Sequence, residues 1–160
     1  PAVGTASLLG RQRDADAALG AERHPVARTS RYRVERQFTS AQETIAMAAI
    51  YAANHYGRVG GIACLTESGT TPLLMSRLSS GLPIFGLSTN GRTLARLSLC
   101  RGVVPLFFDA GGGAEATLEA RTIDFLLDAQ YLARGDALIL TRGDRLGVAG
   151  ATNLLKILAV

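Results

Sequence analysis

The sequence contains no tryptophan, only two cysteines and two histidines, and aromatic residues make up 6% of its 160 residues. No apolar run reaches the roughly 20 residues that a membrane-spanning helix requires, and no signal-peptide pattern opens the chain. Hydrophobic residues nevertheless amount to 48%, which suits one compact domain with a core of Ala, Leu, Ile and Val side chains. We therefore expect a soluble, cytosolic protein.

The scarcity of cysteine and histidine argues against metal binding and thiol chemistry. Cys64 and Cys100 lie in separate apolar segments, far from any second cysteine or histidine at metal-ligand spacing. His24 precedes a proline, and His55 lies near a predicted helix end. We expect both cysteines to be reduced core residues, and the sequence predicts neither a catalytic residue nor a metal site.

Positive charge is concentrated at one end of the chain. Residues 1–40 hold seven arginines against four acidic residues, whereas the remainder holds ten basic residues against nine acidic ones. The later part is therefore nearly neutral, and it lacks the basic face with interleaved aromatic residues that is typical of nucleic-acid binding. We expect neither a nucleic-acid partner nor a membrane partner.

The beginning of the chain differs from the rest in composition. Residues 1–19 are predicted to be a disordered or linker segment, followed by one domain over residues 20–160. A short helix is possible at 14–23, ended before Pro25 because proline disfavours the helical conformation of the preceding residue. Residues 26–38 look extended.

Strand and helix signals alternate from residue 40 onwards. Ser40 and Glu43 form the S-x-x-E pattern of a helix start, and Gly57 marks the end of that helix. Three predicted strands, each followed by a predicted helix, then occur at 62–66 and 70–79, at 84–88 and 90–102, and at 103–108 and 114–132.

The last two predicted strands, 137–141 and 153–160, are joined by a loop too short to contain a helix. They should therefore pair antiparallel. The whole pattern predicts a three-layer α/β/α sandwich, built on a mostly parallel sheet of about five strands with an antiparallel last strand.

The stretch from Ile62 to Met75 is predicted to be a short strand, a turn rich in hydroxyl groups and a helix start. Such a turn offers unpaired backbone N–H groups and hydroxyl donors to a phosphate. The same hydroxyls could instead simply cap the helix, and no lysine marks the stretch as a Walker loop. The hydroxyl residues are Thr66, Ser68, Thr70 and Thr71.

A second loop should lie beside this turn. Open parallel sheets bind ligands at the carboxyl ends of their strands. The loop at 66–71 lies at one such end, and the loop at 142–151 follows a strand that points the same way. Two converging loops favour a pocket for a phosphorylated metabolite over simple capping, with Arg142 and Arg145 as its cations.

The acidic residues are too scattered to build a phosphotransferase site, and no nucleophile, base and orienting group come together. Glu67 is the exception, because it lies within the candidate phosphate loop. An inward carboxylate would repel a phosphate, so we expect Glu67 to face outward or to pair with an arginine. The residues favour a binding domain over an enzyme.

Four motifs follow one another along the chain: Leu65-Thr66-Glu67-Ser68-Gly69, Arg77-Leu78-Ser79-Ser80-Gly81-Leu82-Pro83-Ile84, Arg101-Gly102-Val103-Val104-Pro105, and Gly147-Val148-Ala149-Gly150-Ala151-Thr152-Asn153-Leu154-Leu155-Lys156. In this order they resemble the C-terminal, allosteric domain of pyruvate kinase. The resemblance covers about residues 20–160. The helix at 43–55 and the upstream Gly20-Ala21-Glu22 resemble the bacterial form switched by sugar monophosphates or AMP.

This resemblance implies a parent enzyme that transfers phosphate from phosphoenolpyruvate to ADP with Mg²⁺ and usually K⁺, in a (β/α)₈ barrel that is missing here. The closing Ser-Ala-Glu-Thr segment of that barrel is absent before Gly20, so we expect an excised piece that is inactive alone and has no cofactor of its own. Relatives are tetramers, so self-association is expected too.

The resemblance also assigns residues to an effector. Thr66, Ser68, Gly69, Thr70 and Thr71 would grip its phosphate. Many relatives carry Arg or Lys at the position of Thr70, and the loss of that cation removes a charge-assisted contact of about 1.5–3 kcal/mol. The loop that would close over the rest of the effector contains Arg142, Gly143, Asp144, Arg145, Gly147 and Gly150.

Three functions remain open. The first is a regulatory domain of pyruvate kinase that binds AMP, ribose 5-phosphate or another sugar phosphate. The second is a structural dimerisation module with a decayed effector pocket, which Thr70 and Glu67 would favour. The third is a free-standing enzyme on the same sandwich.

Overall fold

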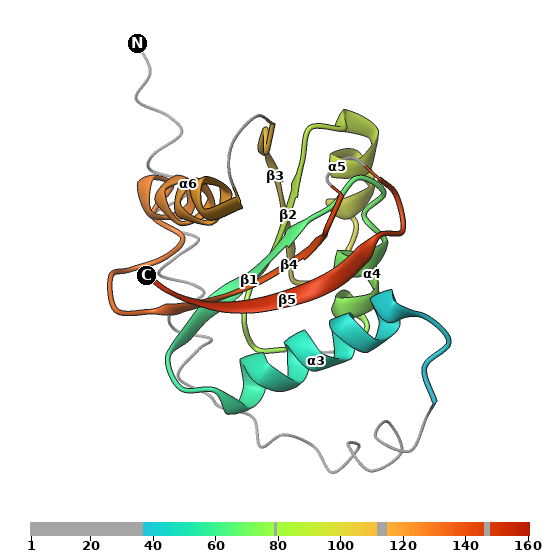
Figure 1. Cartoon of the computed structure of the whole chain (residues 1–160), viewed down its shortest axis with the longest axis horizontal. Helices are drawn as coiled ribbons and strands as arrows, with labels where there is room; N and C mark the ends of the chain where they lie inside the picture. The colour runs from blue at the N-terminus through green and yellow to red at the C-terminus, as the bar shows by residue number, and fades with distance from the viewer. Residues whose placement is uncertain (1–36, 79, 112–114, 146–147) are drawn as a thin grey trace. The chain divides into compact units, whose positions relative to one another are not determined.

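The computed structural model describes residues 37–160 except 79, 112–114 and 146–147 (Figure 1). The chain divides into two units, Pro1–Gln37 and Phe38–Val160, and the fold described below is that of the second. The predicted disordered segment at 1–19 and the predicted helix at 14–23 lie outside the described residues. The same holds for the predicted extended segment up to residue 36.

Strands and helices alternate along the second unit as predicted. The helices are α3 (Ala41–His55), α4 (Thr70–Ser76), α5 (Gly91–Leu97) and α6 (Glu115–Asp128). The strands are β1 (Val59–Leu65), β2 (Ile84–Ser88), β3 (Val103–Phe107), β4 (Ala137–Gly143) and β5 (Thr152–Ala159). α5 ends five residues before the predicted boundary at Gly102, because the amides of Leu99 and Cys100 turn to the carbonyls three residues back.

The start of α3 confirms the predicted cap. Ser40 takes an extended conformation, and its hydroxyl accepts a hydrogen bond from the Glu43 N–H at 3.2 Å. The Glu43 carboxylate reaches back to the N–H of Thr39 at 3.1 Å, one residue before the position that the capping box prescribes. Both contacts satisfy donors that a helix start would otherwise leave unpaired.

The strands form one sheet in the order β3-β2-β1-β4-β5. β1 pairs parallel with β2 and β4, and β2 pairs parallel with β3. β4 and β5 pair antiparallel, which confirms the inference from their short connection. Ile62, Ala63 and Cys64 in the central strand are fully buried, as expected for a parallel sheet covered on both faces.

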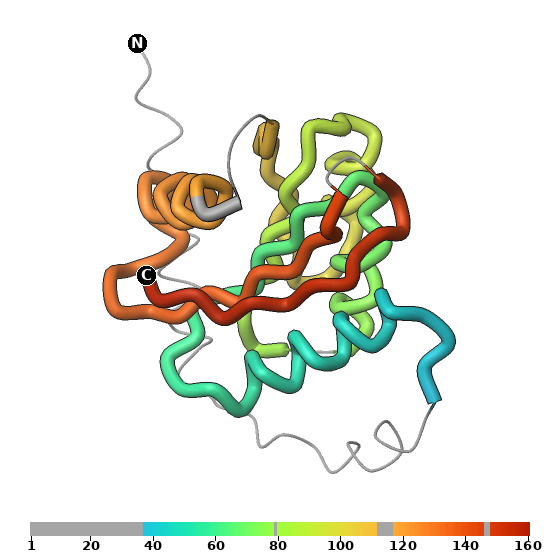
Figure 2. The backbone as a smooth tube through the Cα atoms, in the orientation of Figure 1, coloured from blue at the N-terminus to red at the C-terminus, as the bar shows by residue number. Residues whose placement is uncertain are grey.

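Helices cover both faces of the sheet (Figures 1 and 2). One core cluster joins α3 and α4 to β1, β2 and β4, and a second joins α6 to the opposite sides of the same strands. α5 shares the face of α3, since Leu97 lies against Gly86 of β2. The three-layer sandwich predicted from the sequence is therefore confirmed.

The order of the strands reverses at β1. The chain passes from β1 outward to β2 and β3 through α4 and α5, and then returns through α6 to β4 on the other side of β1. Crossovers between parallel strands are right-handed, so the two directions of travel place their helices on opposite faces. The reversal opens a crevice at the carboxyl ends of β1 and β4, where such sheets bind ligands.

The close packing of α5 on β2 can be tested with an alanine at Gly86. A Cβ there would lie 2.6 Å from Leu97 Cδ1, and Leu97 is fully buried. We expect Gly86→Ala to lower the free energy of unfolding by about 1–3 kcal/mol, measured by urea denaturation. Gly81→Ala is the matched control, because its Cβ would meet nothing within 4 Å. Equal effects of the two variants would contradict this packing.

Candidate functional site

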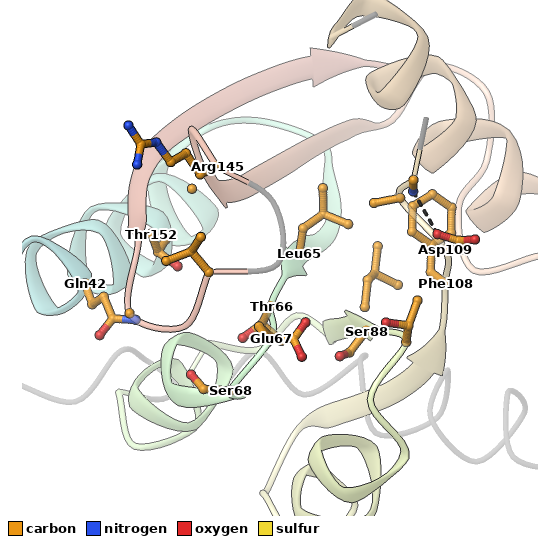
Figure 3. Close-up of a pocket in the computed structure, with 17 residues that line it drawn as sticks. Gln42, Leu65, Thr66, Glu67, Ser68, Ser88, Phe108, Asp109, Arg145 and Thr152 are labelled. Carbon is orange, nitrogen blue, oxygen red and sulfur yellow. Dashed lines mark hydrogen bonds between the residues drawn. The ribbon is translucent and has the colours of Figure 1, made fainter. Parts of the chain in front are cut away.

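A cavity of about 260 Å³ lies at the carboxyl edge of the sheet, at the reversal of strand order (Figure 3). The loops that follow β1, β2, β3 and β4 all reach it, and so do α3 and the first residue of β5. Its volume lies just below the range of about 300–1,000 Å³ that is usual for small-molecule sites. The polar residues that line it are Gln42, Thr66, Glu67, Ser68, Ser88, Thr89, Asp109, Arg145 and Thr152.

The turn after β1 is held in shape by its own polar groups. Thr66 Oγ1 accepts a hydrogen bond from the Gly69 N–H at 2.8 Å, and the hydroxyl oxygens of Ser68 and Thr70 lie 3.0 Å apart. Gly69 has a φ of +73°, which glycine adopts without strain. The N–H groups of Glu67 and Ser68 donate to no described residue, so both remain available to a ligand.

Thr71 links the turn to the first residue of β5. It is 1% exposed, and its hydroxyl donates to Thr152 Oγ1 at 2.9 Å. Of the five residues predicted to grip a phosphate, Thr66 and Ser68 line the cavity, whereas Gly69, Thr70 and Thr71 do not. The hydrogen bond from Thr71 to Thr152 joins the turn to β5. A substitution of Thr71 would therefore disturb the fold as well as the cavity.

The β4–β5 loop meets the first turn at the cavity, as the sequence predicted. Gly143, Arg145 and Gly150 line it, and Gly147 lies outside the described residues. Arg142 is 4% exposed and donates from Nη1 to the Gly143 carbonyl at 3.1 Å, and it does not line the cavity. The exposed Asp144 exchanges hydrogen bonds with Asn153, through its N–H at 3.1 Å and its carboxylate at 2.8 Å, which fixes the base of the loop.

Arg145 is the cation that this loop brings to the cavity. Its side chain is exposed, and Figure 3 shows its guanidinium extending away from Thr66. An arginine has several rotatable bonds and five N–H donors, so Arg145 can turn toward an anion that enters the cavity.

Glu67 does not take the position predicted for it. Its side chain lines the cavity, and Figure 3 shows it directed toward Ser88. No ion pair with an arginine is found within the described part of the chain; the carboxylate instead receives a hydrogen bond from Asn90 Nδ2 at 3.5 Å. The prediction that Glu67 faces outward or pairs with an arginine is therefore wrong, because its carboxylate lines the cavity and is bonded by an amide rather than by a guanidinium. Thr93 Oγ1 donates to the Glu67 carbonyl at 2.7 Å and holds the backbone there.

Sequence reasoning missed the residues that follow β2 and β3. Ser88, Thr89 and Asp109 line the cavity, although the rule that pointed to the end of β1 applies to every parallel strand. The loop after β3 is held by Arg121, which donates to the carbonyls of Asp109 at 2.6 Å and Gly111 at 3.1 Å. That contact joins α6 to the rim of the cavity and could not be read from the sequence.

The described residues contain neither a membrane-spanning helix nor a cluster of metal ligands. None of the helices there is long and apolar enough to cross a membrane. Within residues 37–160, leaving aside 79, 112–114 and 146–147, no three His, Cys, Asp or Glu side chains come close enough together to hold a metal ion.

Comparison with known proteins gives one consistent family. Residues 43–158 match the family model described as pyruvate kinase, alpha/beta domain. The chain is 48% identical to pyruvate kinase II of Salmonella typhimurium over 143 residues, which are 89% of this chain and 29% of that protein. It is 42% identical to the pyruvate kinase of Haemophilus influenzae over 146 residues, 91% of this chain and 30% of that protein.

A more distant relative is the pyruvate kinase of Eimeria tenella, 30% identical over 119 residues that cover 74% of this chain and 22% of that protein. The chain thus spans less than a third of the length of the curated relatives it matches. The matched part agrees with the folded unit described above.

The two cysteines differ in environment. Cys64 is fully buried in β1, and burial raises the pKa of its thiol to about 12 even though a hydrogen bond with Thr141 opposes the rise. Its Sγ donates to the sulfur of Met75 at 3.4 Å. Cys100 is partly exposed, so the prediction of a core position holds for Cys64 and is wrong for Cys100, which lies in the turn after α5.

Thiol titration will test this difference. At pH 8 the Cys64 thiol should stay protonated and inaccessible, because only the thiolate reacts readily. We expect Ellman's reagent to modify Cys100 rapidly in the folded chain and both thiols in denaturant. Cys100→Ser, as the control, should leave the folded chain with no rapidly reacting thiol. Rapid modification of Cys64 in folded Cys100→Ser would contradict its buried position.

Proposed function

The chain belongs to the pyruvate kinase C-terminal α/β domain family, and from that premise we propose that it binds a phosphorylated small-molecule effector in the cavity at the carboxyl edge of its sheet. The observation that carries the proposal is the meeting of the β1 turn and the β4–β5 loop at one cavity, with Thr66, Ser68 and Arg145 among its lining.

These groups suit a phosphate. Thr66 and Ser68 offer hydroxyls, the Glu67 and Ser68 amides are available, and Arg145 can complete the shell. Phosphate oxygens accept such hydrogen bonds strongly, and bonds to a charged group are worth about 1.5–3 kcal/mol each. The hydroxyls of Thr66 and Ser68 also hold the turn, so the phosphate meets donors that are already positioned.

The role of the whole enzyme is proposed from the relatives, which are named as pyruvate kinases. We propose that the parent carries out glycolytic phosphate transfer from phosphoenolpyruvate to ADP in the cytoplasm, with Mg²⁺ and K⁺ bound in its catalytic barrel. This chain would be its allosteric part and inactive alone. The resemblance of the helix at 43–55 and of Gly20-Ala21-Glu22 to the bacterial form switched by sugar monophosphates or AMP supports an effector of that type.

We further propose that the chain self-associates along β5. Among the described strands β5 pairs only with β4, so its outer edge presents unpaired backbone groups to a partner. Two copies of one strand can pair antiparallel about a two-fold axis, which is the commonest symmetry of homodimers. Ile157, 43% exposed on this strand, would be covered in such a pair.

Calorimetry with a matched charge variant will test the phosphate site. We expect the 160-residue chain to bind ribose 5-phosphate or AMP, and Ser68→Asp to weaken that binding at least tenfold, because the added carboxylate meets the phosphate. Ser98→Asp is the control, since it adds the same charge at an exposed position that does not line the cavity. Absence of heat with millimolar ribose 5-phosphate, AMP or fructose 1,6-bisphosphate would instead support the structural module with a decayed pocket.

Sedimentation velocity will test the β5 interface. We expect Ile157→Lys to shift the equilibrium toward monomer at least tenfold, because a charge on an edge strand opposes strand pairing. Leu99→Lys, at a position 86% exposed after α5, should leave the association unchanged. Wild-type protein that stays monomeric at high concentration would refute self-association of this chain.

A further inference from the structure

We propose that Arg121 is a positioning residue for the cavity: from α6 it fixes the loop after β3 in the conformation in which that loop lines the cavity. The four consecutive residues 108–111 of this loop all line the cavity, whereas Arg121 does not. The effect on affinity rests on the proposed binding function. The inference adds a residue that lies outside the cavity and on which the shape of the cavity depends.

The backbone of this loop has few other anchors. The Phe108 N–H donates to the Ser88 carbonyl at 3.1 Å, which ties the start of the loop to β2. Beyond Phe108, the described residues bond the backbone of 109–111 only through the Arg121 guanidinium and through the carboxylate of Asp109, which belongs to the loop itself. Loop backbone without such bonds opens easily. The β3 side of the cavity therefore depends on a contact with α6.

The Arg121 guanidinium bonds two carbonyls of the loop at once. Its Nη2 donates to the Asp109 carbonyl at 2.6 Å, and its Nη1 donates to the Gly111 carbonyl at 3.1 Å. Hydrogen bonds from a charged donor are stronger than those between neutral groups. A guanidinium presents its donors in a fixed plane, whereas a lysine ammonium is a single point at the end of a flexible stem. The contact therefore depends on the shape of the arginine as well as on its charge.

The loop offers these two carbonyls because it forms a closed turn. The Asp109 Oδ1 accepts a hydrogen bond from the Gly111 N–H at 2.8 Å, drawn as a dashed line in Figure 3. Aspartate side chains commonly stabilise turns by bonding the backbone two residues further on. Since this turn brings the carbonyls of residues 109 and 111 within reach of one guanidinium, the bonds from Arg121 fix the turn as one unit.

The same face of α6 also holds the side chain that begins the loop. The Arg121 Cζ lies over the ring of Phe108, 5.8 Å from its centroid, which suits a cation–π contact. Phe125 follows one turn later on α6, and its ring centroid lies 5.2 Å from that of Phe108. Arg121 forms no ion pair with an acidic side chain of the described residues. The contacts that the structure gives to its guanidinium are all with this loop.

The helix that carries Arg121 is itself well anchored. Leu118 and Leu126 belong to the core cluster on that face of the sheet, and Thr122 is fully buried. Removal of the guanidinium should therefore leave α6 in place and release only the loop. A ligand would then have to order residues 109–111 when it binds, and the entropy lost in that ordering lowers affinity.

Arg121→Met in the full chain tests the proposal, because it keeps an unbranched stem and removes the guanidinium. Amide hydrogen exchange without ligand should be at least about tenfold faster at Phe108 and Gly111 and unchanged at Ile62 in β1. Calorimetry with ribose 5-phosphate and with AMP should show at least about tenfold weaker binding. Arg134→Met is the matched control, since it makes the same change at an exposed arginine between α6 and β4 that does not line the cavity.

Arg121→Lys separates geometry from charge. We expect it to bind the same probes about as weakly as Arg121→Met, because an ammonium does not reproduce the planar contact with both carbonyls. Wild-type affinity and exchange in Arg121→Lys would overturn the role of the guanidinium plane. Affinity of Arg121→Met within about threefold of wild type would overturn the positioning role while the phosphate site stands. If neither probe binds wild type, the proposed function fails together with the effect on affinity, and unchanged exchange at Gly111 in Arg121→Met would separately refute the hold on the loop.

Discussion

The right-handed connection between parallel strands is the constraint on which the rest of this structure depends. It places α4 and α5 on one face while the chain moves outward from β1, and α6 on the other face when the chain returns to β4. Both faces of β1 are thereby buried, which lets its residues be apolar without alternation. The same reversal separates the loop that follows β1 from the loop that follows β4. The burial of the core and the opening of the cavity therefore have one cause.

The polar groups at the cavity divide into those that shape it and those left for a ligand. Thr71 bonds Thr152, and Thr93 bonds the carbonyl of Glu67, so these buried hydroxyls satisfy the backbone and each other. The amides of Glu67 and Ser68 and the O–H of Ser88 have no such partner among the described residues. Because of this division, a turn with many hydroxyls can form a rigid helix start and still keep polar groups for a ligand. The sequence alone left both interpretations, helix capping and ligand binding, open.

The fold could be predicted because its signals are local. The capping box at Ser40, the glycines after helices and the continuous apolar strands each act within a few residues, and together they predict the three-layer sandwich.

The candidate site was predictable only in part. Thr66 and Ser68 were found because they follow the strand whose loop the motif marks. Ser88 and Asp109 were missed because nothing in their neighbouring residues distinguishes them, and only the strand order brings them together. Arg142 was assigned to the loop, but it lies within β4, where every residue is buried, and it does not line the cavity.

The two sites that we propose, the cavity and the outer edge of β5, are joined by a short path of contacts. Thr152 lines the cavity, accepts the hydroxyl of Thr71 and begins β5. A ligand that tightened the turn after β1 would therefore act, through one buried hydrogen bond, on the first residue of the strand whose edge we propose as the interface. Allosteric coupling is a free energy between two sites and is reciprocal. Pairing along β5 would then favour the ligand-bound turn as much as the ligand favours pairing, which is the property that a regulatory domain needs to pass a signal to the rest of an enzyme.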